Sequence, residues 1–279
     1  MTAVLLAIVS AMFFGAMTVA VRLGMRSGTD SSGGAASATL ATLLPAFLVA
    51  LVAVAFRPDL HGAWPFLLAG LLAPGGSQIL FTRAIREVGA SRTSVTVGAA
   101  PLVAVAIALV FLGEPLRAPL VLGAAAIVAG GVLLAAERGR PEHLRAIGLL
   151  YAVLAAVLFA TRDNVVRALH ADASPEAAAA ATLLAGLVAT VVWARRAPKA
   201  GELRRMAPAG VLLGLSYVCL FEAYFHGRVT VVSPLVGSES LWAVGLSALL
   251  IRHTEGVGRR LAVGAVLVVA GGIVIGVTR

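Results

Sequence analysis

Residues 123–134 read GAAAIVAGGVLL, and residues 264–275, which begin 141 positions later, read GAVLVVAGGIVI. The two stretches are identical at six of twelve positions and exchange only apolar residues at the others. A glutamate stands nine residues before each stretch, and the segments 13–22 (FFGAMTVAVR) and 158–167 (LFATRDNVVR) also match. Repetition at a nearly constant interval indicates that one structural unit occurs twice in the chain.

The composition places both units in a membrane. Of the 279 residues, 60% are hydrophobic and 13% are charged, and the mean hydropathy is +0.98. Water-soluble domains carry about a quarter charged residues, which coat their surface. We therefore exclude a nucleic-acid-binding globule, a secreted disulfide scaffold and a disordered chain. The single cysteine, Cys219, cannot form an intramolecular disulfide, and we attribute the net charge of +9 to loops that face anionic headgroups.

Ten apolar segments are long enough to cross a bilayer, since a membrane-spanning helix needs about 20 such residues. They are 2–22, 34–56, 63–82, 90–112, 118–136, 146–167, 174–194, 207–226, 229–251 and 259–277. The sequence therefore predicts an all-α integral membrane protein with ten transmembrane helices. We expect a first five-helix repeat at 1–137, a connecting loop at 138–145 and a second five-helix repeat at 146–279.

The odd number of helices in each repeat has a geometric consequence. If each half crosses the membrane five times, the second half is inserted upside down relative to the first. Inverted repeats are a recurring plan of secondary transporters, which bind substrate near the membrane midplane between the halves. The glycine pairs Gly130/Gly131 and Gly271/Gly272 allow helices to approach closely in lipid, and we assign them to helix packing alone.

Short motifs recur in the same order in both halves. The first half contains Ala90–Ser94, Pro101, Leu112–Glu114, Gly123 and Ala129–Gly131, and the second contains Ser238–Ala243, Glu255, Gly264 and Ala270–Gly272. With this spacing the halves resemble two EamA modules of the drug/metabolite transporter (DMT) superfamily. Two places depart from that pattern, because Ser240 replaces an expected proline and His253-Thr254-Glu255 replaces a Leu-Gly-Glu end. The resemblance implies a permease for efflux of amino acids, other metabolites or drug-like compounds across the plasma membrane, and it leaves exchange for protons open.

The loop charges and the resemblance disagree about orientation. Sixteen of the 22 Lys and Arg residues fall on the side opposite the two termini. The positive-inside rule then places both termini outside the cytoplasm, whereas the resemblance implies termini inside. We expect both termini on one side of the membrane and leave the side open.

Ionisable side chains inside apolar spans are costly, so each one indicates a partner, a wet cavity or a function. Glu239 lies near the middle of the ninth segment, between Ser238 and Ser240 and one turn before Trp242. We place Ser240 and Trp242 on the substrate or proton pathway together with Glu239. Pro234 removes one backbone hydrogen bond and is expected to kink this helix beside a cavity. A midplane carboxyl group can take up and release a proton, because burial penalises its charged form. We expect Glu239 to bind a substrate ammonium group or a proton, and a neutral structural glutamate is the alternative.

The eighth segment carries a second candidate pair. Glu222 and His226 are four residues apart and share a helix face, so together they form a candidate proton relay. Tyr217 lies one turn or more earlier, and we place it on the same pathway although it points partly elsewhere. The alternative for His226 is a position at the membrane interface.

Three polar residues in the sixth segment are consecutive. The side chains of Arg162, Asp163 and Asn164 point about 100° apart, so they cannot all face one cavity. We place Asp163 and Asn164 on the pathway and expect Arg162 to extend toward the headgroups. A pair between Asp163 and Arg167, four residues apart, is the structural alternative.

The first half contributes fewer candidates. Gln78 and Thr82 share a face of the third segment, and we place both on the pathway. Gly75 and Gly76 precede them and permit a close approach or a local break. Pro101 is expected to kink the fourth segment.

The sequence lacks the motifs of other chemistries. It contains no GxxxxGK[ST], CxxC, HExxH or GxSxG, and its five histidines are scattered. We therefore expect no catalytic activity, no metal and no cofactor. The expected partners are a small-molecule substrate, the lipid bilayer and protons, without nucleic acid. The favoured function is a secondary transporter that works by alternating access, with an uncoupled facilitator or exchanger as the alternative and a non-transporting membrane protein as the weaker one.

Overall fold

The computed structural model describes residues 2–26, 34–111, 118–135, 146–170, 173–194, 197–251 and 258–277. The predicted connecting loop at 138–145, Glu114 and Glu255 lie outside these ranges. All regular structure in the described residues is helical. Six stretches are long and apolar enough to cross a membrane, judged by length and composition: Thr2–Met25, Ala35–Phe56, Ala90–Phe111, Ala146–Ala168, Pro175–Ala194 and Ala200–His226.

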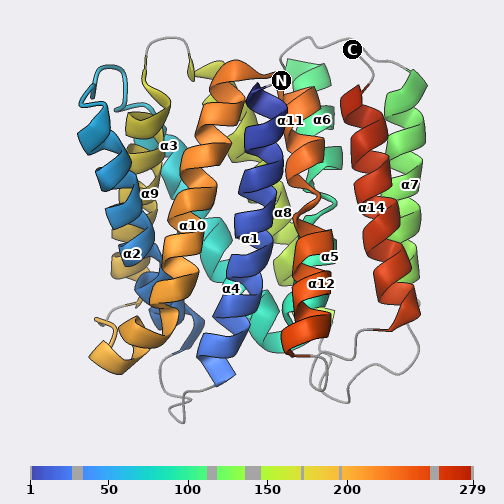
Figure 1. Ribbon diagram of the computed structural model, residues 1–279, viewed down its shortest axis with the longest axis horizontal. Helices are drawn as coiled ribbons and strands as arrows, with labels where there is room; N and C mark the ends of the chain where they lie inside the picture. The colour runs from blue at the N-terminus through green and yellow to red at the C-terminus, as the bar shows by residue number, and fades with distance from the viewer. Residues whose placement is uncertain are drawn as a thin grey trace.

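The long helices stand side by side, with the amino end of α1 and the carboxyl end of α14 at the same end of the molecule (Figure 1). The uninterrupted helices are α1 (Thr2–Arg26), α2 (Gly34–Phe56), α7 (Ala118–Ala135), α8 (Ala146–Ala168), α9 (Pro175–Ala194), α10 (Ala200–His226) and α14 (Arg259–Val277). The start of α10 differs from the predicted residue 207, because the chain is already capped at Lys199. The backbone N–H of Lys199 donates to Glu202 Oε2 at 3.0 Å, which satisfies an amide at the helix start.

Three further helical stretches are interrupted. The first is α3 (Phe66–Gly70), a π-helical turn (Leu71–Gly76) and α4 (Ser77–Val88), with extended backbone at Ala73. It continues to Val88 and not to the predicted 82, because Ile85 and Val88 still bury an apolar face.

The other two interrupted spans are broken at matching places. Gly98 and Ala99 separate α5 (Ala90–Val97) from α6 (Ala100–Phe111), and Gly237 and Ser238 separate α11 (Val229–Val236) from α12 (Glu239–Leu250). Pro101 follows the first break and Pro234 precedes the second. The spans touch where α5 ends, since a Cβ atom on Gly98 would lie 3.1 Å from Ser240 Cβ. The two breaks are hydrogen-bonded turns, and they lie next to each other in the interior.

Helices α7 and α14 pack through glycines, at the right of Figure 1. A Cβ atom on Gly130 would collide with the backbone oxygen of Gly264, and one on Gly271 would collide with that of Gly123. The two contacts run in opposite order along the helices, so α7 and α14 are antiparallel. Gly130 and Gly271 thus make the close helix approach that their sequence predicts, and they make it reciprocally.

An aromatic cluster joins α1, α4 and α8. The ring centroid of Phe14 lies 5.3 Å from that of Phe81 and 5.7 Å from that of Phe159, in tilted and edge-on arrangements. Such ring pairs stabilise a fold beyond the apolar area that they bury. The cluster holds the first helix of each half beside the same span, next to the cavity described below.

Candidate functional site

Segments from both halves surround one interior cavity: α1, α5 and α6 from the first half, and α8, α10, α11 and α12 from the second. Its volume is about 40 Å³. That is room for water, and it is well below the roughly 300–1,000 Å³ of sites that enclose drug-sized ligands. The wall is apolar except for six side chains, which are Ser10, Arg162, Asp163, Ser216, Ser233 and Glu239.

A buried ion pair dominates the cavity wall. Arg162 Nε lies 2.8 Å from Asp163 Oδ1, and the two residues are 3% and 5% exposed. The prediction that Arg162 extends toward the headgroups is wrong. Its guanidinium carbon lies 4.9 Å from the ring centroid of Tyr217 and 5.7 Å from that of Phe159. The rings and the adjacent carboxylate offset the loss of hydration, so this cation remains in the interior.

Glu239 opens α12 directly after the break at Gly237 and Ser238, and its side chain lines the cavity. The residue is 4% exposed, and its Oε1 atom has no hydrogen-bond partner among the described residues. Buried polar atoms are rarely left without a partner. This oxygen therefore lacks a donor, which an occupant of the cavity would supply if the side chain turned toward it.

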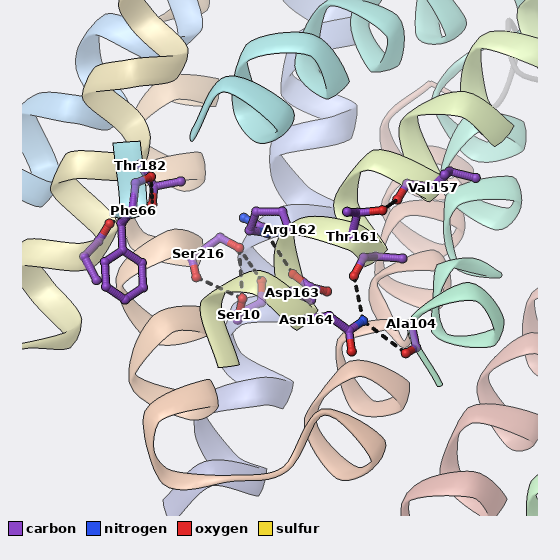
Figure 2. Close-up of polar contacts among 12 residues, drawn as sticks. Ser10, Phe66, Ala104, Val157, Thr161, Arg162, Asp163, Asn164, Thr182 and Ser216 are labelled. Carbon is purple, nitrogen blue, oxygen red and sulfur yellow. Dashed lines mark hydrogen bonds and ion pairs between the residues drawn. The ribbon is translucent and has the colours of Figure 1, made fainter. Parts of the chain in front are cut away.

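Two serines that sequence reasoning missed link α1 to α10 at the cavity wall. The Ser10 hydroxyl donates to the Ser216 carbonyl at 2.9 Å, and the Ser216 hydroxyl donates to the Ser10 carbonyl at 3.0 Å. Figure 2 shows this pair beside Arg162 and Asp163. The available signal was a hydroxyl in an otherwise apolar stretch, but small hydroxyls also occur as plain packing residues in membrane helices.

Asn164 faces away from the cavity. Its amide nitrogen donates to the carbonyls of Ala104 and Ala160 at 3.0 and 2.9 Å, and Figure 2 shows it turned away from Arg162 and Asp163. The expectation that the three consecutive side chains cannot all face one cavity agrees with the structure, since Arg162 and Asp163 line it and Asn164 does not. The alternative pair of Asp163 with Arg167 does not form as the main contact, because Asp163 pairs with Arg162 and Arg167 donates to a backbone carbonyl, that of Tyr224.

Tyr217 and Tyr224 from α10 lie behind the ion pair. Both are fully buried, and their hydroxyls interact with the ion pair, that of Tyr217 with Arg162 and that of Tyr224 with Asp163. Tyr217 was singled out from the sequence, and its ring lies against the Arg162 guanidinium. Tyr224 was not, since nothing in the sequence tells which face of α10 meets α8.

The first-half candidates lie elsewhere. Thr82 accepts a hydrogen bond of 3.0 Å from the Thr39 hydroxyl, and the Gln78 amide nitrogen lies 3.9 Å from Met17 Sδ. These contacts join α4 to α2 and α1, and neither Gln78 nor Thr82 lines the cavity. Gly75 lies in the π-helical turn, so the local break that its sequence permits is present.

Ser240 and Trp242 follow Glu239 but do not line the cavity. The Ser240 hydroxyl donates to the Gly237 carbonyl at 3.1 Å, across the helix break. Trp242 is 40% exposed, and its Cβ atom lies where a side chain on Gly15 would be. Both residues shape the start of α12 and leave the cavity wall to Glu239.

Glu222 and His226 lie outside the cavity. Glu222 borders a separate pocket, where its Oε1 atom is 3.7 Å from Arg57 Nη1. His226 is exposed, and its Nδ1 atom contacts the backbone carbonyl of Glu222 at 2.8 Å and not the carboxylate. The two share a helix face without forming the direct side-chain contact that a proton relay requires.

Known proteins resemble this chain in sequence and in fold. The model described as EamA-like transporter family matches residues 1–136 and 146–277. No curated protein matches the chain. A solved structure titled "Crystal structure of protein" aligns with a TM-score of 0.71 at 21% sequence identity, and the alignment covers 98% of this chain and 95% of that chain. At this identity the likeness shows a shared fold.

Proposed function

Because the chain belongs to the EamA-like transporter family, and is thus a multi-pass membrane transporter, we propose that it exports small organic solutes by alternating access through the central cavity. The observation that carries the proposal is the interior site itself. One cation and two carboxyl groups line it, and helices of both halves supply its walls. We place the protein in the plasma membrane, where a metabolite exporter acts.

The architecture that fits this function is ten spans in two inverted repeats. The antiparallel, reciprocal glycine contacts of α7 and α14 support inversion, because equivalent helices of such repeats run in opposite directions. The common end of the two termini in Figure 1 supports an even number of crossings.

The charges of the cavity favour a substrate that carries both an amino and a carboxyl group. Arginine binds carboxylates through paired N–H donors, and Arg162 supplies such a group. The free oxygen of Glu239 accepts a donor, as an ammonium group would offer. An amino acid matches both features within one small cavity.

The cavity must widen before it accepts such a solute. We assign this motion to the helix breaks at Gly98 and Gly237, since interrupted helices border the site and end at it. Broken spans beside the substrate site are a known device of transporters, where free backbone groups face the ligand.

Proton exchange through Glu239 is the coupling that we favour. The carboxyl group is buried in the cavity. When it is protonated it loses the negative charge that attracts an ammonium group, so proton binding and substrate binding exclude each other. Glu222 does not share this position, because it lies in the separate pocket with Arg57.

The test is uptake of a panel of radiolabelled amino acids by reconstituted vesicles, with and without a proton gradient. We expect Glu239→Gln to lower gradient-driven transport by about tenfold or more, as loss of one charged hydrogen bond predicts. Asp59→Asn, an exposed loop substitution, is the matched control and should transport normally. Transport by Glu239→Gln that stays fully gradient-dependent would refute coupling at this residue, and wild-type transport that ignores the gradient would favour the facilitator.

A further inference from the structure

A second cavity opens at the end of the helix bundle where the termini lie. It is bordered by α1, α2, α9 and α10, which are neighbours in Figure 1, and its volume is about 300 Å³. Four apolar side chains form most of its wall, and Cys219 and three charged residues complete it. The apolar side chains are Leu6, Ala53, Phe56 and Val218. A cavity of this size lies within the range of known small-molecule sites.

We call this second cavity the lateral pocket, and the charges in it do not cancel. Arg57 Nη1 lies 3.0 Å from Glu176 Oε1 and 3.7 Å from Glu222 Oε1. One guanidinium thus faces two carboxylates, which leaves one negative charge over. The Arg57 side chain is 67% exposed, so it is free to move toward solvent when another cation arrives.

Each carboxylate also keeps one unused oxygen. Glu176 Oε2 and Glu222 Oε2 are buried, and neither has a hydrogen-bond partner among the described residues. Glu176 is only 9% exposed. A buried carboxylate oxygen without a donor is unfavourable, so each side chain would gain by turning this oxygen toward a hydrogen-bond donor in the pocket.

We propose that the lateral pocket binds a primary alkylammonium group. The ammonium would donate to the free oxygens of Glu176 and Glu222, and its chain would lie against Leu6, Phe56 and Val218. An ammonium group supplies three N–H donors and no acceptor, and it balances the surplus negative charge. Two sources have this chemistry, namely the headgroup of a phosphatidylethanolamine lipid and a free amphipathic amine. The proposal does not depend on transport through the central cavity.

Cys219 provides the reporter, because it lines this pocket and is the single cysteine of the sequence. The purified protein is placed in phosphatidylcholine nanodiscs, and the rate of its alkylation by a maleimide is measured with and without decylammonium. We expect decylammonium to slow alkylation by about tenfold, as expected for charge-assisted hydrogen bonds. Decyltrimethylammonium, which has no N–H donor, should give little protection.

Glutamine variants identify the acceptors. Glu176→Gln and Glu222→Gln should each abolish most of the protection, expressed as the ratio of rates with and without amine. Asp59→Asn removes a nearby charge that does not line the pocket and should keep full protection. If a variant does not fold, the difference between decylammonium and decyltrimethylammonium on the wild type still decides the matter.

Lipid composition separates the two sources. Protection in phosphatidylethanolamine nanodiscs without added amine assigns the pocket to the lipid headgroup, whereas protection by decylammonium alone assigns it to a free amine. The proposal is overturned if neither ligand slows alkylation, if both amines protect equally, or if both glutamine variants keep the protection.

Discussion

The central cavity and the lateral pocket contain the same charged groups in different settings. Each has one arginine and two carboxylates, which are Arg162 with Asp163 and Glu239 in the cavity, and Arg57 with Glu176 and Glu222 in the pocket. In the cavity the arginine is 3% exposed and enclosed by aromatic rings. In the pocket the side chain of the arginine is 67% exposed. The two clusters have the same kinds of charged residue, so we attribute the difference in how much each contributes to the free energy of unfolding to burial.

The two clusters also differ in how the chain supplies them. Arg162 and Asp163 are neighbours on one helix, so their pairing needs no tertiary contact. Arg57 follows α2, Glu176 begins α9 and Glu222 lies late in α10, so the pocket forms only when three helices pack. We therefore expect the cavity pair to resist local motion and the pocket to respond to its surroundings.

Among substitutions that test the difference between the two clusters, we expect Asp163→Ala to have the largest effect on stability. It leaves Arg162 buried without its carboxylate, and we expect the free energy of unfolding to fall by about 3–5 kcal/mol. Thermal and denaturant unfolding in detergent measures the change. The double variant Arg162→Met, Asp163→Leu should regain most of the loss, because neither member of the ion pair is then left buried without its partner. Equal losses in the single and double variants would show that the ion pair is not the cause.

A smaller effect is expected from Tyr217→Leu. The ring lies 4.9 Å from the Arg162 guanidinium, and a desolvated cation–π contact is worth about 2 kcal/mol. Tyr217→Phe keeps the ring against the guanidinium and removes only the hydroxyl, so it should cost less stability than Tyr217→Leu. The same unfolding assay compares the two. If Phe costs as much as Leu, the hydroxyl and not the ring supports the cation.

The smallest effect is expected from Arg57→Gln in the lateral pocket. Only the Arg57 side of these ion pairs is exposed, but solvent on that side screens them, so we expect a loss of about 1 kcal/mol that salt lowers further. Unfolding at low and high ionic strength should therefore bring wild type and variant closer together as salt rises. A loss comparable to that of Asp163→Ala would mean that exposure does not separate the two clusters.

The helical ranges were largely predictable because lipid leaves the backbone no alternative to helix. The predicted segments 34–56 and 259–277 have the bounds of α2 and α14. The extended backbone at Ala73 was not predictable, since it depends on packing against α9, where Gly186 faces Pro74. The family match over both halves confirms the resemblance carried by the short motifs.

The site was predictable only where charged residues interrupted an apolar segment. Glu239 and Asp163 were singled out in this way, and both line the cavity. The same reasoning selected Glu222, but its partner Arg57 lies 165 positions away and becomes visible only when α2 packs on α10. Ser10 carried too weak a signal, because helix rotation decides whether a lone hydroxyl meets a cavity or a neighbour.

The reciprocal glycine contacts between α7 and α14, here called the glycine seam, mean that substitutions in one half constrain which residues the other half can accept. Gly130 packs against the main chain at Gly264, and Gly271 packs against the main chain at Gly123. Each half therefore contributes one close-packed glycine and one stretch of main chain that receives the glycine of the other half. A bulkier residue in either half would push the helices apart along the whole seam and weaken the untouched contact as well. At this glycine contact, neither half can change alone.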